Sequence, residues 1–182
     1  MTSSGKTVPV VLALLTFMTC QMAAYGTERP NTAPISDVLL YKTSIRDVDR
    51  THGFAGVSGV LDELESRALN EDTKSLARLF EIFFISDGYV TEGVLASIGA
   101  VYKARPVFVL RTAHTYDSPK RDLIYKCIIF DVYYGPVFQG EYPSNVGELK
   151  GLGKQAARLL QMYDYYLKHP QDIEDWSVNP PE

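Results

Sequence analysis

The stretch SLARLFEIFFISDGYVTEGVLASIGAVYKARPVFVL, residues 75–110, decides the fold class of this chain. Its first part places apolar residues three and four apart, which is the spacing of an amphipathic helix, and that spacing resumes after Asp87-Gly88. Glycine supplies the left-handed residue on which many helices end, and Pro106 closes one helix or opens the next. Two apolar helices joined by a tight turn indicate an α-hairpin.

This hairpin resembles one repeat of the HEAT kind, in which pairs of helices stack side by side. The resemblance covers about a fifth of the chain, and no second copy follows at a fixed period. The sequence therefore predicts an all-α domain of six or seven short antiparallel helices. These helices are expected to pack either as a compact bundle or as a short HEAT-like hairpin array.

Helical spacing extends toward the N-terminus. Apolar residues follow it from Ser36, a candidate N-cap, to Val48, and His52-Gly53 then breaks the chain. A second stripe covers residues 54–68, and a third helix is expected to start near Asp72 and to be the most buried.

Beyond Pro106 the pattern is ambiguous. Residues 107–110 and 125–134 are rich in β-branched and aromatic side chains, which also suit strands. Ser118-Pro119 is nevertheless a good helix start, and the apolar residues behind it keep helical spacing. We favour helix for residues 107–134 and keep strand as the alternative.

Two further features concern the C-terminal third. Gly135–Ser144 contains two glycines and two prolines and predicts a loop. Asn145 and Glu148 have capping-box spacing and predict one last helix that ends at His169-Pro170. Within this helix, residues Gly151 to Ala156 have the pattern G-x-G-x-x-A, which also occurs in dinucleotide-binding sites. Such a site requires a strand before the first glycine, and a helical pattern stands there instead. We therefore interpret the glycines as small residues where a neighbouring helix approaches closely.

Residues 1–26 have the pattern of an export signal that is cleaved after translocation. Lys6 precedes an apolar run from Val8 to Met18, which is shorter than the roughly 20 residues that cross a bilayer. Ala24-Tyr25-Gly26 predicts the cleavage site, with Met22-Ala23-Ala24 as the alternative. The mature protein is therefore expected to be periplasmic or secreted.

Cys20 indicates an alternative form of export, in which a lipid is attached to this cysteine. Lipoprotein processing favours small residues before the cysteine, whereas Phe17-Met18-Thr19 stands there. Simple cleavage is the preferred prediction, and a lipid anchor at Cys20 is the alternative.

The predicted organisation is a signal peptide (1–26), a polar linker (27–35), a helical domain (36–170) and an acidic, proline-rich tail (171–182) in which Trp176 is the residue that can pack back. Cleavage removes Lys6 and no acid, which leaves 17 basic against 22 acidic side chains. This acidic balance argues against nucleic acid as a partner, and no second apolar stretch reaches membrane length.

Candidate catalytic and metal-binding residues are few. The three histidines are far apart in sequence, and neither H-E-x-x-H nor C-x-x-C occurs. Cys127 stands in an apolar stripe, where cysteine usually behaves as a small buried hydrophobe. We therefore expect no metal, no cofactor and no catalytic site, with a pair of Cys127 and His114 as the enzymatic alternative.

Aromatic residues give the strongest indication of a binding surface. Tyrosine provides a large contact area at low entropic cost and keeps a polar tip, so it is common in interfaces. The candidate binding residues, all on or beside the predicted loop, are Tyr133, Tyr134, Phe138, Glu141 and Tyr142. The alternative is that these rings close the end of the core.

The profile as a whole predicts an exported, non-enzymatic helical protein that binds another protein. Immunity proteins against periplasmic toxins, small inhibitors and envelope assembly factors share it, although only as an analogy of type. The acidic surplus suits a basic partner. The alternatives are a small envelope enzyme that uses Cys127 or a scattered His/Glu site, and a helical domain that binds an apolar ligand.

Overall fold

The computed structural model describes residues 35–141, 145–177 and 180, so the predicted signal peptide and most of the predicted linker lie outside the described residues. The described residues form eight α-helices and contain no strand, which confirms the predicted all-α class and exceeds the expected six or seven helices. The elements are α2 (Asp37–Tyr41), α3 (Ile45–Leu69), α4 (Thr73–Ile85), α5 (Gly88–Ala104), α6 (Pro106–Ala113), α7 (Ser118–Gln139), α8 (Val146–Gly151), α9 (Lys154–Lys168) and the 3-10 helix η1 (Pro170–Ile173).

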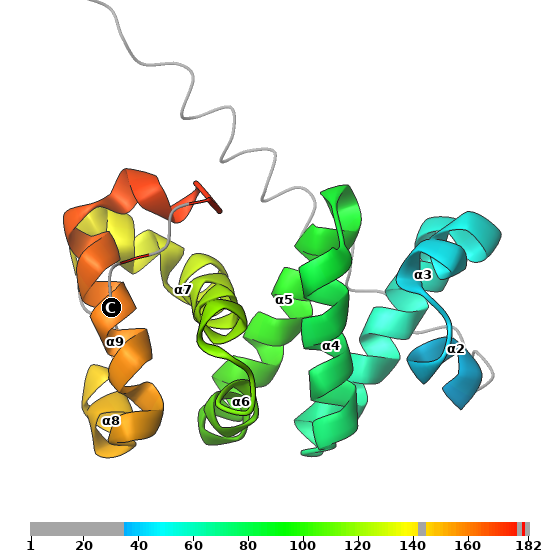
Figure 1. The fold of residues 1–182 in the computed structure, drawn as a ribbon, viewed down its shortest axis with the longest axis horizontal. Helices are drawn as coiled ribbons and strands as arrows, with labels where there is room; N and C mark the ends of the chain where they lie inside the picture. Colours follow the sequence, from blue (N-terminus) through cyan, green and yellow to red (C-terminus); the bar gives the residue numbers. More distant parts are fainter. Residues whose placement is uncertain (1–34, 142–144, 178–179, 181–182) are drawn as a thin grey trace, which may run out of the picture. The chain divides into compact units, whose positions relative to one another are not determined.

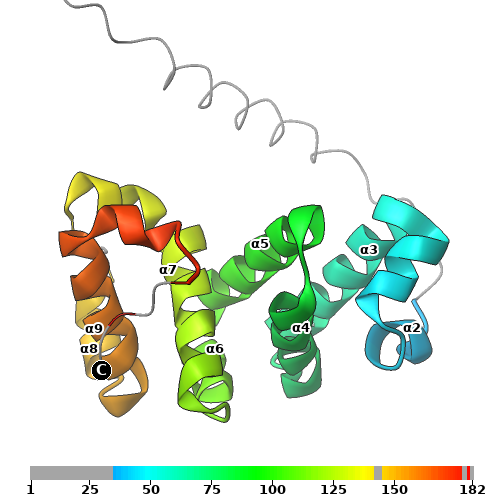
Figure 2. The ribbon, with the colours of Figure 1, turned by 45° about the horizontal axis from the view of Figure 1, so that its top comes forward.

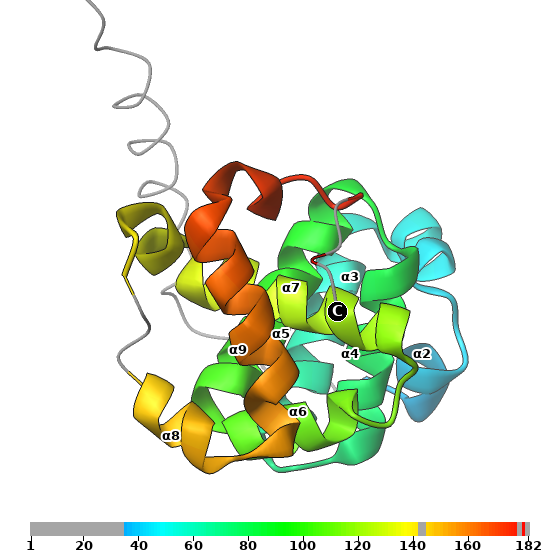
Figure 3. The same ribbon diagram turned by 60° about the vertical axis from the view of Figure 1, so that its left-hand side comes forward.

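The longer helices stack as successive hairpins (Figure 1). α3, α5 and α7 pack against one another in order, and α4, α6 and α9 pack against them and against each other as a second layer. α2 lies against α3, and α8 lies against α9 (Figure 3). No helix in the described part of the chain is long and apolar enough to cross a membrane.

The core consists of the apolar stripes that predicted the helices. In α4 the fully buried residues include Leu76, Leu79 and Phe80, and in α5 they include Val94 and Ile98. Full burial of one such side chain stabilises a fold by about 1.5–3 kcal/mol. The hairpin in residues 75–110 therefore forms the centre of the domain.

Residues 107–113 and 118–134 are helical, as preferred from the sequence, and a turn over residues 114–117 separates the two helices. Val107–Leu110 lies in α6, and α7 covers the second ambiguous stretch. The helix start at Ser118-Pro119 is confirmed, although the N-cap is Asp117, whose carboxylate accepts a hydrogen bond of 3.2 Å from the backbone N–H of Lys120. This cap and the burial of the apolar face outweigh the strand preference of the β-branched residues.

The predicted continuous helix from Ser36 to Val48 is wrong. It is interrupted between α2 and α3, because Ser36 caps α2 and Ser44 caps a new helix by accepting a hydrogen bond of 3.3 Å from Arg46 N–H. The predicted break at His52-Gly53 is confirmed as a kink inside α3, where Gly53 has a φ of 60°.

The turn between α4 and α5 contains the expected left-handed glycine, since Gly88 has a φ of 53°. Gly88 begins α5, and the hydroxyl of Thr91 in this helix lies 3.1 Å from the Ser86 hydroxyl across the turn.

The single last helix expected after Asn145 is split into α8 and α9. Gly153 has a φ of 58° and separates them, a conformation that glycine adopts at little cost. A Cβ atom added at Gly151 or at Gly153 would meet nothing within 4 Å, so the expected close approach of a neighbouring helix is wrong. The G-x-G-x-x-A stretch is a turn between two helices.

The chain beyond α9 packs back onto the helices (Figure 2). η1 contacts α9 and α7, and Ile173 is fully buried. Trp176, expected to be the packing residue of the tail, lies with its ring centroid 5.7 Å from those of Phe83 and Phe130.

Candidate functional site

A pocket of about 420 Å³ lies where the turn between α5 and α6 meets the C-terminal part of α7 and the start of α8. Both charged and apolar side chains surround it. Its lining residues are Tyr102, Lys103, Pro106, Val132, Tyr133, Pro136, Asn145 and Glu148.

The α5–α6 wall of the pocket depends on Pro106. The residue before a proline is kept out of the α conformation, and Arg105 accordingly has φ −140° and ψ 59°. α5 therefore ends at Ala104, and α6 starts with Pro106 in its first turn. This sharp corner leaves Tyr102 and Lys103 on the last turn of α5, beside the cavity.

The α7 wall depends on Pro136. Proline has no N–H, so Pro136 cannot donate the usual helical hydrogen bond to the carbonyl of Val132, and both residues line the pocket. The helix nevertheless continues for one more turn and ends at Gly140, which has a φ of 70°. Glu141 N–H donates to the Pro136 carbonyl (2.9 Å), and Gly140 N–H donates to that of Val137 (3.1 Å). This pair of bonds is a Schellman motif.

The loop predicted over Gly135–Ser144 is therefore wrong for residues 135–139, which belong to α7. Glycine and proline disfavour the interior of a helix, but a proline one turn from the end of a long, packed helix removes a single hydrogen bond. The left-handed Gly140 is the residue that stops the helix.

Two tyrosine hydroxyls and one amide form a line along the pocket. The Tyr133 hydroxyl donates to Asn145 Oδ1 at 3.1 Å, so its single proton is used there. The Tyr102 hydroxyl, 3.2 Å from that of Tyr133, must then be the donor in their bond. Burial raises the pKa of Tyr102 well above its ordinary value, and Tyr133 adds to the effect, so this phenol stays protonated at neutral pH.

This bond also explains why the predicted capping box at the start of α8 is wrong. The Asn145 side chain makes no capping hydrogen bond to the helix. Its amide oxygen accepts from Tyr133 instead, which couples the start of α8 to α7.

The Lys103 ammonium is held at the pocket by a carboxylate from the neighbouring helix. Its Nζ lies 3.6 Å from Asp131 Oδ2. Asp131 fits against α5 because residue 99 is glycine, where an added Cβ would lie 1.8 Å from Asp131 Oδ2. Burial raises the pKa of the Asp131 carboxyl, and the Lys103 charge opposes that shift.

Of the predicted binding residues whose side chains the structure describes, only Tyr133 lines the pocket, and it is buried. Tyr134 is half-buried, stacks edge-on with Phe130, and donates its hydroxyl proton to Glu174 in the tail. Glu141 is exposed, and its backbone carbonyl accepts a hydrogen bond of 2.7 Å from Tyr163. Phe138 lies in α7, where its side chain is not described, and Tyr142 lies outside the described residues.

The residues that sequence reasoning missed are those of the α5–α6 corner. The sequence pattern places Pro106 at a helix boundary and does not single out Tyr102 or Lys103 as site residues. The contact between Tyr102 and Tyr133 joins residues 31 apart in sequence, and it exists because α5 stacks on α7. The Pro106 boundary was the signal available for this corner.

The enzymatic alternative receives little support from the geometry. Cys127 is fully buried, and burial raises the pKa of its thiol well above the ordinary value, with the Asp131 charge adding to the shift. A reactive cysteine needs the opposite, an accessible thiolate. His114 is exposed, and its Nδ1 lies 3.3 Å from the Tyr125 hydroxyl. Within the described ranges, no group of three or more His, Cys, Asp or Glu side chains is placed to hold a metal ion.

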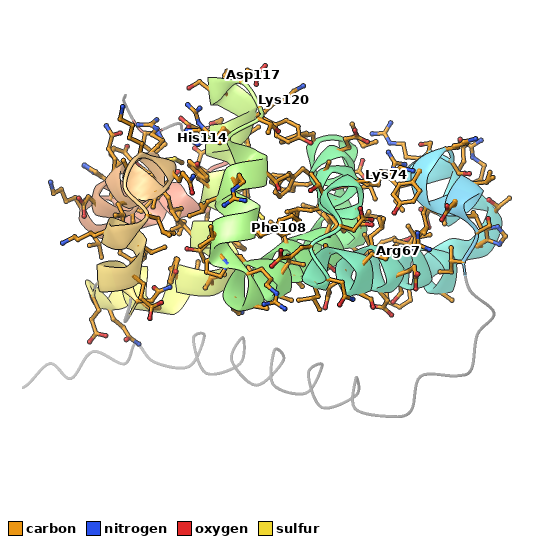
Figure 4. All side chains as sticks on the ribbon, turned by 90° about the horizontal axis from the view of Figure 1, so that it is seen from below. Arg67, Lys74, Phe108, His114, Asp117 and Lys120 are labelled. Carbon is orange, nitrogen blue, oxygen red and sulfur yellow. The ribbon has the colours of Figure 1, made fainter. Side chains whose placement is uncertain are left out.

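A polar network fastens α2 to the two helices after it. The Tyr41 hydroxyl lies 2.7 Å from that of Ser75 and donates to Asp72 at 3.2 Å. Arg67 bonds Asp37 at 2.9 Å, and the Lys74 ammonium lies 3.7 Å from the centroid of the Tyr41 ring. Figure 4 shows Arg67 and Lys74 beside α2. The members of this network contact one another, so we interpret the network as the attachment of α2 to α3 and α4.

An exposed aromatic pair lies at the start of the helical array. Phe54, just after the kink in α3, is 58% exposed, and its ring centroid is 5.5 Å from that of Tyr89, which is 40% exposed. Tyr89 also donates a hydrogen bond to Asp49. The pair shares no lining residue with the pocket.

Comparison with known proteins gives no relative for this arrangement: no family model, no curated protein and no solved structure matches the chain.

Proposed function

We propose that this chain is an exported, non-enzymatic helical protein that binds another protein, and that the pocket between α5, α6, α7 and α8 receives a side chain of that partner. The observation that carries the proposal is the composition of the pocket. Prolines form apolar walls, buried phenol hydroxyls and an amide form the interior, and Lys103 and Glu148 place opposite charges at the pocket. Such a mixture suits recognition of a polar side chain by shape and hydrogen bonds.

Binding is favoured over catalysis because the described residues that line the pocket include no activated group. Its buried Tyr102 has a raised pKa and stays protonated, so it donates hydrogen bonds and does not act as a base at neutral pH. Lys103 is paired with Asp131. An arrangement for acid–base work would instead set two titratable groups near the working pH.

The partner that fits best is a basic protein. The mature chain has 22 acidic against 17 basic side chains, and complementary fields speed the encounter of two proteins. Export to the periplasm or the exterior remains part of this proposal, carried by the pattern of residues 1–26, as does removal of that segment near Gly26. An immunity protein, an inhibitor or an envelope assembly factor would have this character.

The finer architecture that we propose is a short HEAT-like hairpin array. The order of packing supports it, since α3, α5 and α7 stack in succession with α4, α6 and α9 beside them. Arrays of this kind commonly bind proteins along one face, because each hairpin adds surface without changing the others.

An apolar ligand is a weaker occupant for the pocket. It would offer no hydrogen bond to the polar side chains that line the pocket, among them Lys103, Asn145 and Glu148, and covering a polar group without offering it a hydrogen bond costs about 1–3 kcal/mol. The pocket chemistry therefore favours a polar group of a protein partner.

Site-specific photo-crosslinking in the native host tests the proposal. A benzoylphenylalanine placed at Gly147, whose added Cβ would meet nothing within 4 Å, projects from α8 next to Glu148. The matched control places the same residue at Phe54, an exposed aromatic site away from the pocket. We expect a defined protein adduct from position 147 and none of the same mass from position 54.

Charge reversal gives the second arm. Glu148→Lys should reduce the adduct at position 147 about tenfold if a basic partner docks there, which corresponds to a loss of about 1.4 kcal/mol. An adduct that forms equally from both positions, or that Glu148→Lys leaves unchanged, contradicts the proposed site.

A further inference from the structure

A separate surface, formed by α4, α7 and α9, is covered by the chain's own C-terminal segment. We define the tail groove by its wall residues, which are Phe83, Lys126, Phe130, Tyr134 and Arg158. Lys126, Phe130 and Tyr134 recur every four residues and so lie along one strip of α7. None of these wall residues lines the pocket.

The groove holds the tail by its backbone. The Lys126 ammonium donates to the carbonyl of Asp172 at 3.0 Å and also to the carbonyl of Asp175. Arg158 Nη2 donates to the carbonyl of Pro180 at 3.0 Å. Carbonyl oxygens are present in every peptide, so these three bonds place few demands on sequence.

One aromatic ring and the acidic side chains supply the selectivity. The Trp176 ring lies between those of Phe83 and Phe130, with both centroid distances 5.7 Å. Tyr134 donates to the Glu174 carboxylate, and the Lys126 ammonium lies 5.4 Å from the centroid of the Trp176 ring. Aromatic pairs in edge-to-face geometry stabilise a contact beyond the apolar area that they bury.

Lys126 makes simple opening of the groove unfavourable. Its side chain is fully buried, and burial lowers the pKa of the amine, with the charges of Asp175 and Asp172 opposing that shift. Departure of the tail removes both carbonyl acceptors named above from the Lys126 ammonium. A replacement segment that brings its own carbonyl oxygens restores those bonds, so exchange costs less than opening.

From these contacts we infer that the tail groove is a peptide-binding site, and that the tail occupies it in place of an extended acidic segment with one aromatic residue from a partner protein. The aromatic wall extends beyond Trp176, since the ring centroid of Phe84 lies 5.8 Å from that of Phe83 and 5.8 Å from that of Tyr116. Lys120, labelled in Figure 4, lies 5.8 Å from the Phe84 ring centroid and adds positive charge on that side. A longer acidic segment has aromatic and cationic contacts available there.

Competition with a synthetic peptide tests this inference on the full chain. The probe is residues 170–180 carrying a fluorescent dye, and its binding is followed by polarisation. The attached tail competes at an effective concentration on the order of millimolar, so the unmodified chain should bind the probe weakly. Trp176→Ala weakens the competitor and leaves the wall intact, and it should bind the probe at least about tenfold more tightly.

Two controls locate the effect. Adding Lys126→Met to Trp176→Ala should weaken probe binding about tenfold, while adding Phe54→Ala should leave it unchanged. Unchanged helical circular dichroism of each variant shows that it is folded. A Trp176→Ala chain that is folded but binds the probe no better than the unmodified chain overturns the inference.

The single tryptophan of the chain provides a test that needs no variant. Adding the unlabelled peptide with Trp176→Phe to the unmodified chain should shift the Trp176 emission to the red as the tail leaves, and the shift should saturate. The same peptide with Trp176→Ala should give no shift at equal concentration. The inference is overturned if millimolar peptide does not shift the Trp176 emission while urea does. It is also overturned if the chains form a dimer by exchanging tails, because the groove would then bind a second copy of the chain.

Discussion

The ion pair between α7 and α9 allows a quantitative test of the fold. Arg158 Nη2 lies 2.6 Å from Asp122 Oδ2, and Arg158 Nε donates to both oxygens of the same carboxylate, at 3.2 and 3.1 Å. The side chains are only 13% and 7% exposed. Arg158→Met keeps most of the apolar stem and removes the charge, which leaves a buried carboxylate without its partner.

The expected loss follows from this burial. Breaking a buried, hydrogen-bonded pair from one side costs about 3–5 kcal/mol in the free energy of unfolding. At about 2–4 °C per kcal/mol for a domain of this size, the melting midpoint of Arg158→Met should fall by about 10 °C. Adding Asp122→Leu removes the unpaired charge as well, so the double variant should recover at least half of the loss.

Urea and thermal unfolding, followed by circular dichroism, measure these differences. The matched control is Arg50→Met, because Arg50 pairs with Asp47 at 3.4 Å with side-chain exposures of 78% and 53%. An exposed pair contributes about 0–1 kcal/mol, so this variant should melt almost as the unmodified chain does. If Arg158→Met also loses less than about 1 kcal/mol, α7 and α9 do not pack as described.

Four further outcomes are expected. Burial raises the pKa of Tyr125 to about 12, above its ordinary value of 10.0. The contribution of the neutral phenol to the free energy of unfolding is therefore present below pH 10 and should be lost as the pH rises from 10 toward 12. Urea melts across that range, with tyrosinate absorbance measured alongside, would contradict this if the free energy of unfolding stayed constant. Gly99→Ala places a Cβ 1.8 Å from Asp131 Oδ2 and should cost about 1–3 kcal/mol in urea unfolding, with most of the loss absent in an Asp131→Ala background. Cys127→Ser should cost about 1–2 kcal/mol, and the native thiol should react with a labelling reagent only as fast as the chain opens; rapid labelling would revive the enzymatic alternative. Mass spectrometry of the native product should find Thr27 or a neighbour at the N-terminus, whereas an intact Met1 would refute export and a lipid on Cys20 would indicate a lipoprotein.

Helix positions could be predicted because they depend on local patterns. The apolar stripe of residues 75–85 became α4, the break at Gly53 became a kink, and Gly88 took the left-handed conformation. Each depends on the spacing of apolar residues or on the freedom of a glycine, and both are visible in the sequence.

The helix ends near Gly135-Pro136 and Asn145 could not be predicted in the same way. Composition indicated a loop, but packing of α7 on α5 and α9 carries the helix through Pro136 to Gln139. Capping-box spacing indicated an N-cap, but the Asn145 amide oxygen accepts a hydrogen bond from Tyr133. In both places a tertiary contact overrides a local preference.

The candidate site was only partly visible in the sequence for the same reason. Successive residues on a helix point about 100° apart, so Tyr133 faces Tyr102 and the pocket while Tyr134 faces Glu174 in the tail. The sequence could indicate that the aromatic residues of this region matter. It could not assign them to two different surfaces, because that division depends on which helices stack beside α7.

Hydrogen–deuterium exchange of the full chain, with and without the partner identified by crosslinking, measures whether that partner occupies the pocket. We expect the partner to slow exchange in the segments that line the pocket, residues 102–106, 132–136 and 145–148, and to leave the α2–α3 end unchanged. Slowed exchange confined to the region around Phe54 and Tyr89, with no change at the pocket segments, would contradict it.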